Sequence, residues 1–424
     1  IRFINEASAN KILYADLRSN NIIAPGTLGA GVVNFGTTTG LNGNDNNIIR
    51  YCDIHEDGLS NPTIGISSIG SITSVATNND NNIIDSCNIY NYFNPTIATA
   101  GIYVGANNGS WTINANKFYQ TVSVTTTGTQ SHRAMWITPN TAALTSASGF
   151  IITNNYIGGN ASNGTGTCTM NGTSAYQYLA MDISVGIGTA TSVQNNTITN
   201  FAITTGFSGN CIYGINVANG NVNVGTISGN LFGSTTTNGA FTYTTTTTNG
   251  GIIPLRSGAG GTINFSNNIV SGVDLISSST TSFNVFNGIA GSGGANIIIN
   301  NNTIGSTTLV NSINMISTSA TATAASTLRG IICNSATAGV VNTITNNVVS
   351  NLNSNYAATG TQATNLVGIS VTTGTSTVTG NIIRNLTSAT QTTAGGSTSA
   401  IVGISYTSTT APAVIINNKI NNLV

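Results

Sequence analysis

The chain has 424 residues, a charged fraction of only 5% and a net charge of zero. Because no excess of Lys and Arg is present to neutralise phosphates, this composition argues against a nucleic-acid partner. Six prolines and few charges argue against a long disordered tail. The remainder is rich in Asn, Thr, Ser and Gly, which form helices poorly, so a helical bundle is excluded.

The beginning of the chain carries no targeting signal. It opens with Ile1 rather than Met, and no stretch of about 18 apolar residues occurs anywhere, so we expect no membrane span and a segment cut from a longer chain. Five cysteines are too few, and odd in number, for a disulfide framework. The low charge and abundant Asn, Thr and Ser favour an extracellular or cell-surface location.

A six-residue pattern recurs along the chain in the order apolar, any, any, Asn, any, apolar. One copy is 227–232, which is centred on Asn230 and begins with Ile227. Successive copies are separated by 29 residues (87 to 116) up to 45 residues (302 to 347). Twelve copies indicate a repeat array. The anchor residues, of which the first three depart from Asn, are Ala15, Cys52, Cys87, Asn116, Asn155, Asn196, Asn230, Asn268, Asn302, Asn347, Asn381 and Asn418.

A second pattern, Gly followed by Ile or Val, precedes most anchors, as in 214–217 (Gly-Ile-Asn-Val). Apolar β-branched residues that alternate with small or polar ones predict a short strand with one buried face. Each unit therefore reads as a strand, a loop, a strand, a tight Asn turn, a strand and a long Thr/Ser/Gly loop.

Units of strands without helices between them predict a coil, in which each strand pairs in parallel with its counterpart about 4.8 Å away in the next repeat. We predict an all-β fold, a single right-handed parallel β-helix of about twelve coils that spans 1–424. The handedness rests on the general preference of parallel connections. The coils of 1–95 are richer in charge, and those of 96–424 are poor in charge and carry the Asn column.

The Asn column predicts a ladder of buried amides, because each inward-facing amide can donate to a carbonyl of the next coil and accept from the previous coil. The residue before each of the last eight anchors is Asn or Gly, the types that tolerate a left-handed turn. At the start of the column, Cys52 and Cys87 should be reduced, buried thiols in contact, because in-register stacking points both Cβ atoms the same way.

The stacked Asn-x-Ile pattern resembles the pectin-lyase-like superfamily of right-handed parallel β-helices. Thr- and Asn-rich coils such as 368–371 (Gly-Ile-Ser-Val) and 381–386 (Asn-Ile-Ile-Arg-Asn-Leu) are similar to those of large secreted surface proteins of Bacteroidetes-type bacteria. The resemblance covers nearly the whole chain and implies the fold, which lyases, hydrolases, adhesins and surface filaments share.

We expect a structural or adhesive extracellular domain without enzymatic activity. Its partners would be neighbouring repeats or domains of the same protein, a second copy bound end to end, or glycans. The alternative is a carbohydrate-active enzyme, a polysaccharide lyase or hydrolase, or a glycan-binding module. A groove that gathers acidic and aromatic side chains on one strand face would favour the alternative.

Acidic residues concentrate at the start of the chain, where eight of the ten lie within the first 85 positions. Aligning the coils on their anchors places Asp16 beside Asp53, and Asp45 beside Asp80. Two carboxylates one coil apart, near a His and an Arg, can bind Ca²⁺ or act as acid and base. These four residues are the calcium candidates, with a solvated acidic face as the alternative, and no catalytic residue is assigned.

Aromatic residues suggest a second kind of site. Tyr90, Tyr92, Trp111 and Trp136 could form a platform on which glycans stack, although the same residues could simply fill the core. The Thr run at 244–248 is not repeated from coil to coil, which argues against an ice-binding array.

Overall fold

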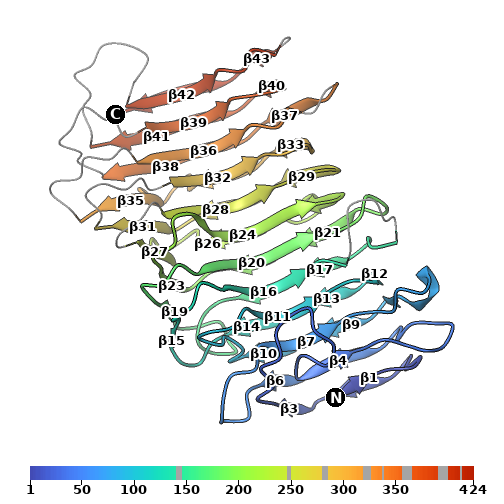
Figure 1. Ribbon diagram of the computed structural model, residues 1–424. Helices are drawn as coiled ribbons and strands as arrows, with labels where there is room; N and C mark the ends of the chain where they lie inside the picture. Colours follow the sequence, from blue (N-terminus) through green and yellow to red (C-terminus); the bar gives the residue numbers. More distant parts are fainter. Residues whose placement is uncertain are drawn as a thin grey trace.

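The computed structural model describes residues 1–139, 146–245, 250–278, 285–318, 326–336, 339–355, 365–389, 400–410 and 413–424. Within these ranges the chain is all-β, apart from a short turn of 3-10 helix at Val75–Thr77. Parallel strands stack from one end of the molecule to the other in three sheets (Figure 1). The predicted parallel β-helix is confirmed, and its right-handedness stays a prediction. Part of the Thr run, 246–248, lies outside the described residues.

The first sheet is built from the Gly-Ile strands. Its twelve strands are β1 (Arg2–Phe3), β4 (Val33–Phe35), β7 (Ile64–Ser68), β11 (Thr99–Val104), β16 (Ser131–Ile137), β20 (Gln177–Ser184), β24 (Gly209–Asn219), β28 (Gly250–Ser257), β32 (Val285–Gly291), β36 (Thr327–Cys333), β39 (Asn365–Val371) and β42 (Ile401–Tyr406).

The second sheet precedes the Asn turn. Its twelve strands are β2 (Lys11–Leu13), β5 (Ile48–Arg50), β9 (Ile83–Asp85), β13 (Thr112–Asn114), β17 (Ile151–Thr153), β21 (Thr191–Gln194), β25 (Val222–Val224), β29 (Thr262–Ser266), β33 (Asn296–Asn300), β37 (Val341–Thr345), β40 (Thr375–Thr379) and β43 (Val414–Ile416). A small pair beside it joins β8 (Asn79–Asp80) and β12 (Asn108–Gly109).

The third sheet follows the Asn turn and divides into two ladders. The main ladder contains β3 (Asp16–Arg18), β6 (Asp53–His55), β10 (Asn88–Tyr90), β14 (Lys117–Tyr119), β18 (Tyr156–Ile157), β22 (Thr197–Ile198), β26 (Leu231–Gly233), β30 (Ile269–Ser271), β34 (Thr303–Gly305), β38 (Val348–Asn355), β41 (Ile382–Ser388) and β44 (Lys419–Leu423). The branch contains β15 (Val124–Thr125), β19 (Cys168–Asn171), β23 (Phe201–Thr204), β27 (Phe241–Thr245), β31 (Val273–Ser277) and β35 (Ile313–Ser317). Both ladders merge in β38, which pairs with β34 and β35.

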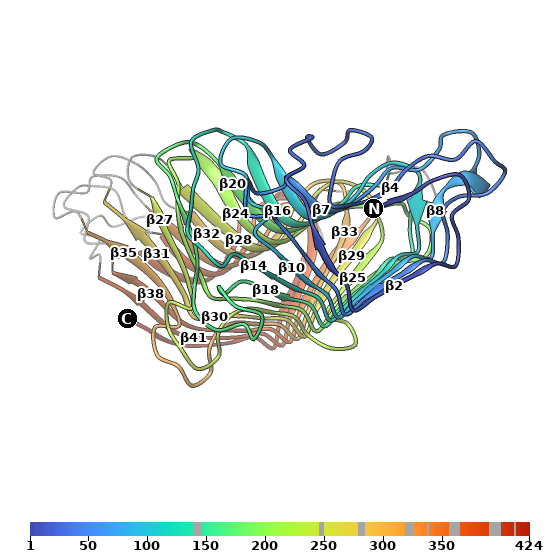
Figure 2. The same ribbon diagram turned by 90° about the horizontal axis from the view of Figure 1, so that it is seen from below.

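The predicted ladder lies where the second sheet meets the third, and successive coils overlie one another there (Figure 2). The Asn302 side chain is fully buried, and its Nδ2 donates to Oδ1 of Asn347 at 3.0 Å and to the carbonyl of Phe265 in the preceding coil at 2.8 Å. The same side-chain contact links every successive pair from Asn116 to Asn418. Each buried amide is therefore hydrogen-bonded on both sides.

Seven of the eight residues before the last eight anchors adopt the predicted left-handed conformation. Their φ angles lie between 53° and 69°, and they are Asn154, Asn195, Asn267, Asn301, Asn346, Gly380 and Asn417. The prediction is wrong for Gly229, before Asn230, which does not have a positive φ. Asn418 is hydrogen-bonded as expected, but it is only half-buried because it lies in the last coil.

The copy at 227–232 differs from the prediction. Ile227 is 85% exposed, and Val224 instead pairs with Val193 and Phe265. Val224 lies six residues before Asn230, where the regular spacing is three (193 to 196), so this turn contains three additional residues. The buried side chain of Gln194 supports it by accepting a hydrogen bond from the Ile227 amide at 3.0 Å.

Two further Asn ladders were not predicted, and they lie in the first coils. Asn47 donates through N and Nδ2 to Oδ1 of Asn82 at 2.9 and 3.0 Å. Asn44 makes the same two bonds to Asn79. The repeated Asn-Asp-Asn-Asn at 44–47 and 79–82 was the available signal, because it places equivalent amides one coil apart.

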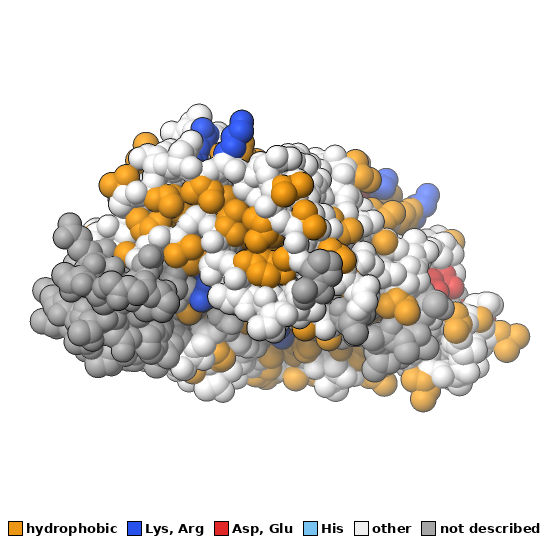
Figure 3. Space-filling model, turned by 90° about the horizontal axis from the view of Figure 1, so that it is seen from above, with side chains coloured by type: hydrophobic (Ala, Val, Ile, Leu, Met, Phe, Trp, Pro, Cys, Tyr) orange, Lys and Arg blue, Asp and Glu red, His pale blue; other side chains and the backbone are white. Residues whose placement is uncertain are grey.

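An apolar core runs through the stack from Phe3 to Leu386. Figure 3, which views the C-terminal end of the stack, shows hydrophobic side chains on that surface. Val414, Ile416 and Ile420 of the last coil are among the exposed apolar residues. The described residues contain no helix that is long and apolar enough to cross a membrane.

Candidate functional site

The predicted acidic residues lie on the outside of the first coils, in the register that the sequence indicated. Asp16 pairs with Asp53, and Arg18 pairs with His55. The Asp16 carboxylate contacts Arg18 at 2.6 Å and His55 at 2.9 Å. The hydrogen bond from Arg18, with a smaller contribution from His55, lowers the pKa of Asp16 to about 2. This carboxylate is already neutralised by its neighbours.

The second acidic pair is more buried. The backbone amide of Asp80 donates to Oδ1 of Asp45 at 2.7 Å. Burial, and then the nearby charge of Asp45, raise the pKa of Asp80 to about 7, and burial also raises the pKa of Asp45.

The calcium hypothesis gains no further acidic ligand. Nowhere in the described ranges do three His, Cys, Asp or Glu side chains gather in a group that could hold a metal. Calcium requires about six to eight oxygen ligands. Asp53 accepts a hydrogen bond from Asn88 at 2.8 Å. Protein groups therefore bind the carboxylates of both Asp16 and Asp53, and no metal ion is needed to account for the position of either.

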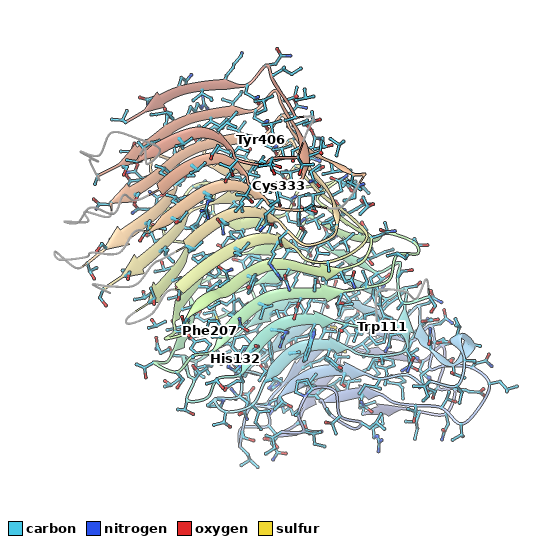
Figure 4. The ribbon with its side chains drawn as sticks, turned by 45° about the horizontal axis from the view of Figure 1, so that its top comes forward. Trp111, His132, Phe207, Cys333 and Tyr406 are labelled. Carbon is cyan, nitrogen blue, oxygen red and sulfur yellow. The ribbon has the colours of Figure 1, made fainter. Side chains whose placement is uncertain are left out.

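The glycan platform is wrong for two of its four residues. Trp111 is 0% exposed and donates from Nε1 to the carbonyl of Asn79 at 2.7 Å, and Tyr92 is 2% exposed. Trp111 also packs edge-on against Phe35, with ring centroids 5.0 Å apart, inside the N-terminal coils (Figure 4). Both side chains therefore belong to the close-packed core of the N-terminal coils.

Tyr90 faces outward, but both faces of its ring are covered. Its centroid lies 4.4 Å from that of His55 and 4.8 Å from that of Tyr119, and the rings are nearly parallel. In-register stacking produces this arrangement, because equivalent side chains are separated by the strand spacing. Tyr90 therefore presents its edge to the solvent and offers no free face to a sugar.

Trp136, the fourth predicted stacking residue, lies half-buried on the outside of the first sheet. The guanidinium carbon of Arg133 lies 4.0 Å from the centroid of its indole ring, in a cation–π contact. Trp136 and Tyr90 belong to different sheets, so they do not form one platform.

A hydrogen-bonded row of four residues crosses this face of the first sheet. Arg133 Nε contacts Asp182 Oδ2 at 2.8 Å, and Asp182 Oδ1 accepts from Asn216 Nδ2 at 2.8 Å. Asn216 Oδ1 then accepts from Arg256 Nη1 at 2.8 Å. The Arg133–Arg256 row thus joins β16, β20, β24 and β28, and it contains two guanidinium groups but one carboxylate.

A hollow of about 290 Å³ lies at the end of this row. Its lining residues are Asn210, Ile253, Arg256, Asn287, Ala290, Ser292, Ile332 and Asn334. Arg329 lies beside it, where Nη1 contacts Oδ1 of Asn287 at 3.5 Å and burial lowers its pKa. A guanidinium group surrounded by side-chain amides suits a carboxylate or another anionic group.

Sequence reasoning missed this row because its members are far apart in the chain. Each of Asp182, Asn216 and Arg256 follows the inward apolar residue of its Gly-Ile strand. In the relevant strands Ala180 and Pro254 replace the glycine, which hides the pattern.

His132 and the two cysteines at the start of the anchor column lie inside the core. His132 is fully buried, its Nδ1 contacts the Thr99 hydroxyl at 2.8 Å, and burial lowers its pKa to about 3, so it is a neutral core residue. Cys52 and Cys87 are buried in the same column, and the Cys87 amide donates to Asn116 Oδ1 at 2.9 Å.

Comparison with known proteins adds no relative to this picture. No protein-family profile, no curated protein sequence and no solved structure matches the chain.

Proposed function

We propose that this chain is a structural and adhesive β-helix module of a large secreted or surface protein of a bacterium. The Asn ladder and the parallel sheets supply a stiff scaffold, because every coil is hydrogen-bonded to its neighbours along three sheets. The pectin-lyase-like resemblance of the Asn pattern is compatible with such a role. The low charge and abundant Asn, Thr and Ser favour a location outside the cell.

The Arg133–Arg256 row carries this proposal, with acidic glycans as its ligands. Four polar side chains from four successive coils are bonded in one line, and the line ends at a hollow that contains Arg256 and three Asn side chains. Arg recognises carboxylates through directed, charge-assisted hydrogen bonds. Trp136, which packs against Arg133 and Tyr103, lies at the other end of the line.

The enzymatic alternative is supported less well. The row contains a single carboxylate, Asp182, which already accepts hydrogen bonds from Arg133 and Asn216. Hydrolysis of a glycosidic bond normally uses two carboxyl groups with separate roles. Asp16, with a pKa of about 2, is not suited to donate a proton near neutral pH.

Calorimetric titration of the purified chain with tetragalacturonate and with uncharged tetrasaccharides tests the proposal. We expect the acidic ligand to bind, and Arg256→Gln to weaken its binding at least tenfold. Arg18→Gln, on the third sheet, removes the same charge elsewhere and should leave binding unchanged. If Arg256→Gln binds tetragalacturonate as tightly as the unmodified chain does, the result would count against the proposal. The appearance of cleaved or unsaturated saccharide products would favour the enzymatic alternative.

A further inference from the structure

A second hollow lies on the third sheet, at the corner where the chain passes from the main ladder to the branch. Neighbouring coils make this corner differently. Long loops at 158–167 and 234–240 join β18 to β19 and β26 to β27, whereas only residues 199–200 join β22 to β23. A cleft of about 520 Å³ lies between the two loops. Residues of the loop at 234–240 form one wall, Tyr156 and Thr167 on either side of residues 158–166 form the other, and the short connection with the start of β23 forms the floor. We call this cleft the corner slot.

The wall at 158–167 is held by its own hydrogen bonds. The Tyr156 hydroxyl donates to the carbonyl of Gly164 at 2.9 Å, and Asn200 Nδ2 donates to the same carbonyl at 2.8 Å. Gly158, the first residue after β18, has a φ of 124°, and a Cβ added to it would collide with the Thr199 carbonyl. Glycine is therefore required at this position.

The wall at 234–240 is fixed in a similar way. The Ser234 hydroxyl accepts hydrogen bonds from the amides of Thr236 and Thr237, each at 3.2 Å. Asn238 Nδ2 donates to the carbonyl of Val310, two coils away, at 3.1 Å. A slot with both walls fixed loses little conformational freedom when it binds a ligand.

The chemistry of the lining is polar but uncharged. The residues around the slot are Tyr156, Thr167, Thr199, Asn200, Phe201, Ala202, Leu231, Gly233, Ser234, Thr237, Gly239, Ala240 and Thr242. This set has no Asp, Glu, Lys, Arg or His, and the carboxylate of Asp274 lies beside Gly239 and Thr242. An anionic ligand would therefore lose water without gaining a partner. Hydroxyl and amide groups interspersed with Ala202, Leu231 and Ala240 match a ligand that has hydroxyl groups and apolar CH faces.

We propose that the corner slot binds an uncharged saccharide unit. Its volume falls within the range of roughly 300–1,000 Å³ that ligand pockets occupy. The site lies on a different sheet from the Arg133–Arg256 row, takes an uncharged rather than an anionic ligand and depends on none of the same residues. It would let the module hold a neutral glycan independently of an acidic one.

Titration with uncharged gluco-, manno- and galacto-tetrasaccharides, with tetragalacturonate as the charged comparison, tests the corner slot. Ala202 lies outward on the floor, and Ala202→Phe should abolish the binding of the neutral ligand by filling the slot. Thr167→Val, at an exposed position of the lining, removes one hydroxyl and should weaken binding about fivefold. Thr204→Val, two residues beyond Ala202 on the same strand, makes the matched change outside the slot and should have no effect.

Three results would overturn the proposal: none of the neutral tetrasaccharides binds, Ala202→Phe binds them as the unmodified chain does, or Arg256→Gln abolishes their binding. Arg256→Gln separates this proposal from the adhesive role of the Arg133–Arg256 row, because it should weaken only the acidic ligand. Loss of acidic binding in Arg256→Gln with neutral binding retained would support both sites.

Discussion

At the scale of single residues, the buried amides depend on one another. Asn268 donates through N and Nδ2 to Oδ1 of Asn302 at 2.9 and 3.0 Å. Replacing Asn302 with Leu should therefore lower the free energy of unfolding by about 1–3 kcal/mol, because donors of Asn268 lose their acceptor in the core. Denaturant unfolding measures this loss. Asn20→Leu, at an exposed loop position, is the control and should change stability by less than about 0.5 kcal/mol. An unchanged midpoint for Asn302→Leu would contradict the role of the ladder.

Asp80 should make the stability of the first coils depend on pH. Because its pKa is raised to about 7 in the folded protein, the folded state binds a proton more tightly than the unfolded chain. The contribution of Asp80 to the free energy of unfolding is complete below about pH 4, the ordinary pKa of an Asp side chain. It is lost as the pH rises through about 7.

The variant Asp80→Asn should be less sensitive to pH than the unmodified chain. Unfolding midpoints between pH 4 and pH 8 should fall in the unmodified chain and stay flatter in the variant. Asp57→Asn, an exposed position, serves as the comparison. Parallel curves for all three proteins would show that Asp80 titrates normally.

Cys52 and Cys87 remain predicted as reduced thiols. The hydrogen bond with the Cys52 side chain, and then burial, raise the pKa of the Cys87 thiol, so it should react slowly in the folded state. After unfolding without a reductant, both should be alkylated, as should the buried Cys168, which serves as the internal standard. If mass measurement shows that only Cys52 and Cys87 need prior reduction, they form a disulfide.

At the scale of the elements, the Gly-Ile pattern sets how closely the first and third sheets approach. A Cβ added to Gly330 would lie 2.5 Å from a side-chain carbon of Val349 and 2.7 Å from the carbonyl oxygen of Gly368. The glycine column thus leaves room for the apolar side chains of the third sheet, which is a packing requirement and not a turn requirement.

Gly330→Ala should destabilise the protein by about 1–3 kcal/mol through overpacking. Gly294→Ala is the matched control, because nothing lies within 4 Å of its added Cβ. Denaturant unfolding of both variants provides the measurement. Equal midpoints would mean that the sheets can separate at no cost, contrary to the packing described here.

At the scale of the whole molecule, the two ends of the stack present strands whose backbone groups are paired on one side only. Val414, Ile416 and Ile420 are exposed at one end, as are Ile4 and Leu13 at the other. Parallel edge strands can pair with further chains. We expect this polypeptide to associate end to end as its concentration rises.

Sedimentation velocity across a hundredfold range of concentration checks this expectation. Replacing Ile416 with Lys places a charge on the exposed edge and should shift the distribution towards the monomer. Ile227→Lys, an exposed change on the side of the stack, should not. A chain that stays monomeric throughout the range would contradict end-to-end association.

The coil fold and its ladder could be predicted from the sequence because both are periodic. Each Asn anchor from 116 to 418 repeats the same ladder hydrogen bond, and the spacing alone places Asp16 beside Asp53, as the strand register confirms. Repeating a hydrogen-bonded unit once per coil leaves its mark at every repeat, so local pattern and tertiary contact coincide.

For residues outside the repeat pattern, only the tertiary structure decided whether the side chain is buried or exposed and which other residues it contacts. Trp111 and Tyr92 are buried, Ile227 is exposed on a lengthened turn, and the residues of the Arg133–Arg256 row come together although they lie 34 to 49 residues apart (133, 182, 216, 256). The corner slot likewise depends on the unequal lengths of loops in neighbouring coils. Such features occur once rather than in every coil, so periodicity carries no information about them, and only the packing of one particular coil on the next determines them.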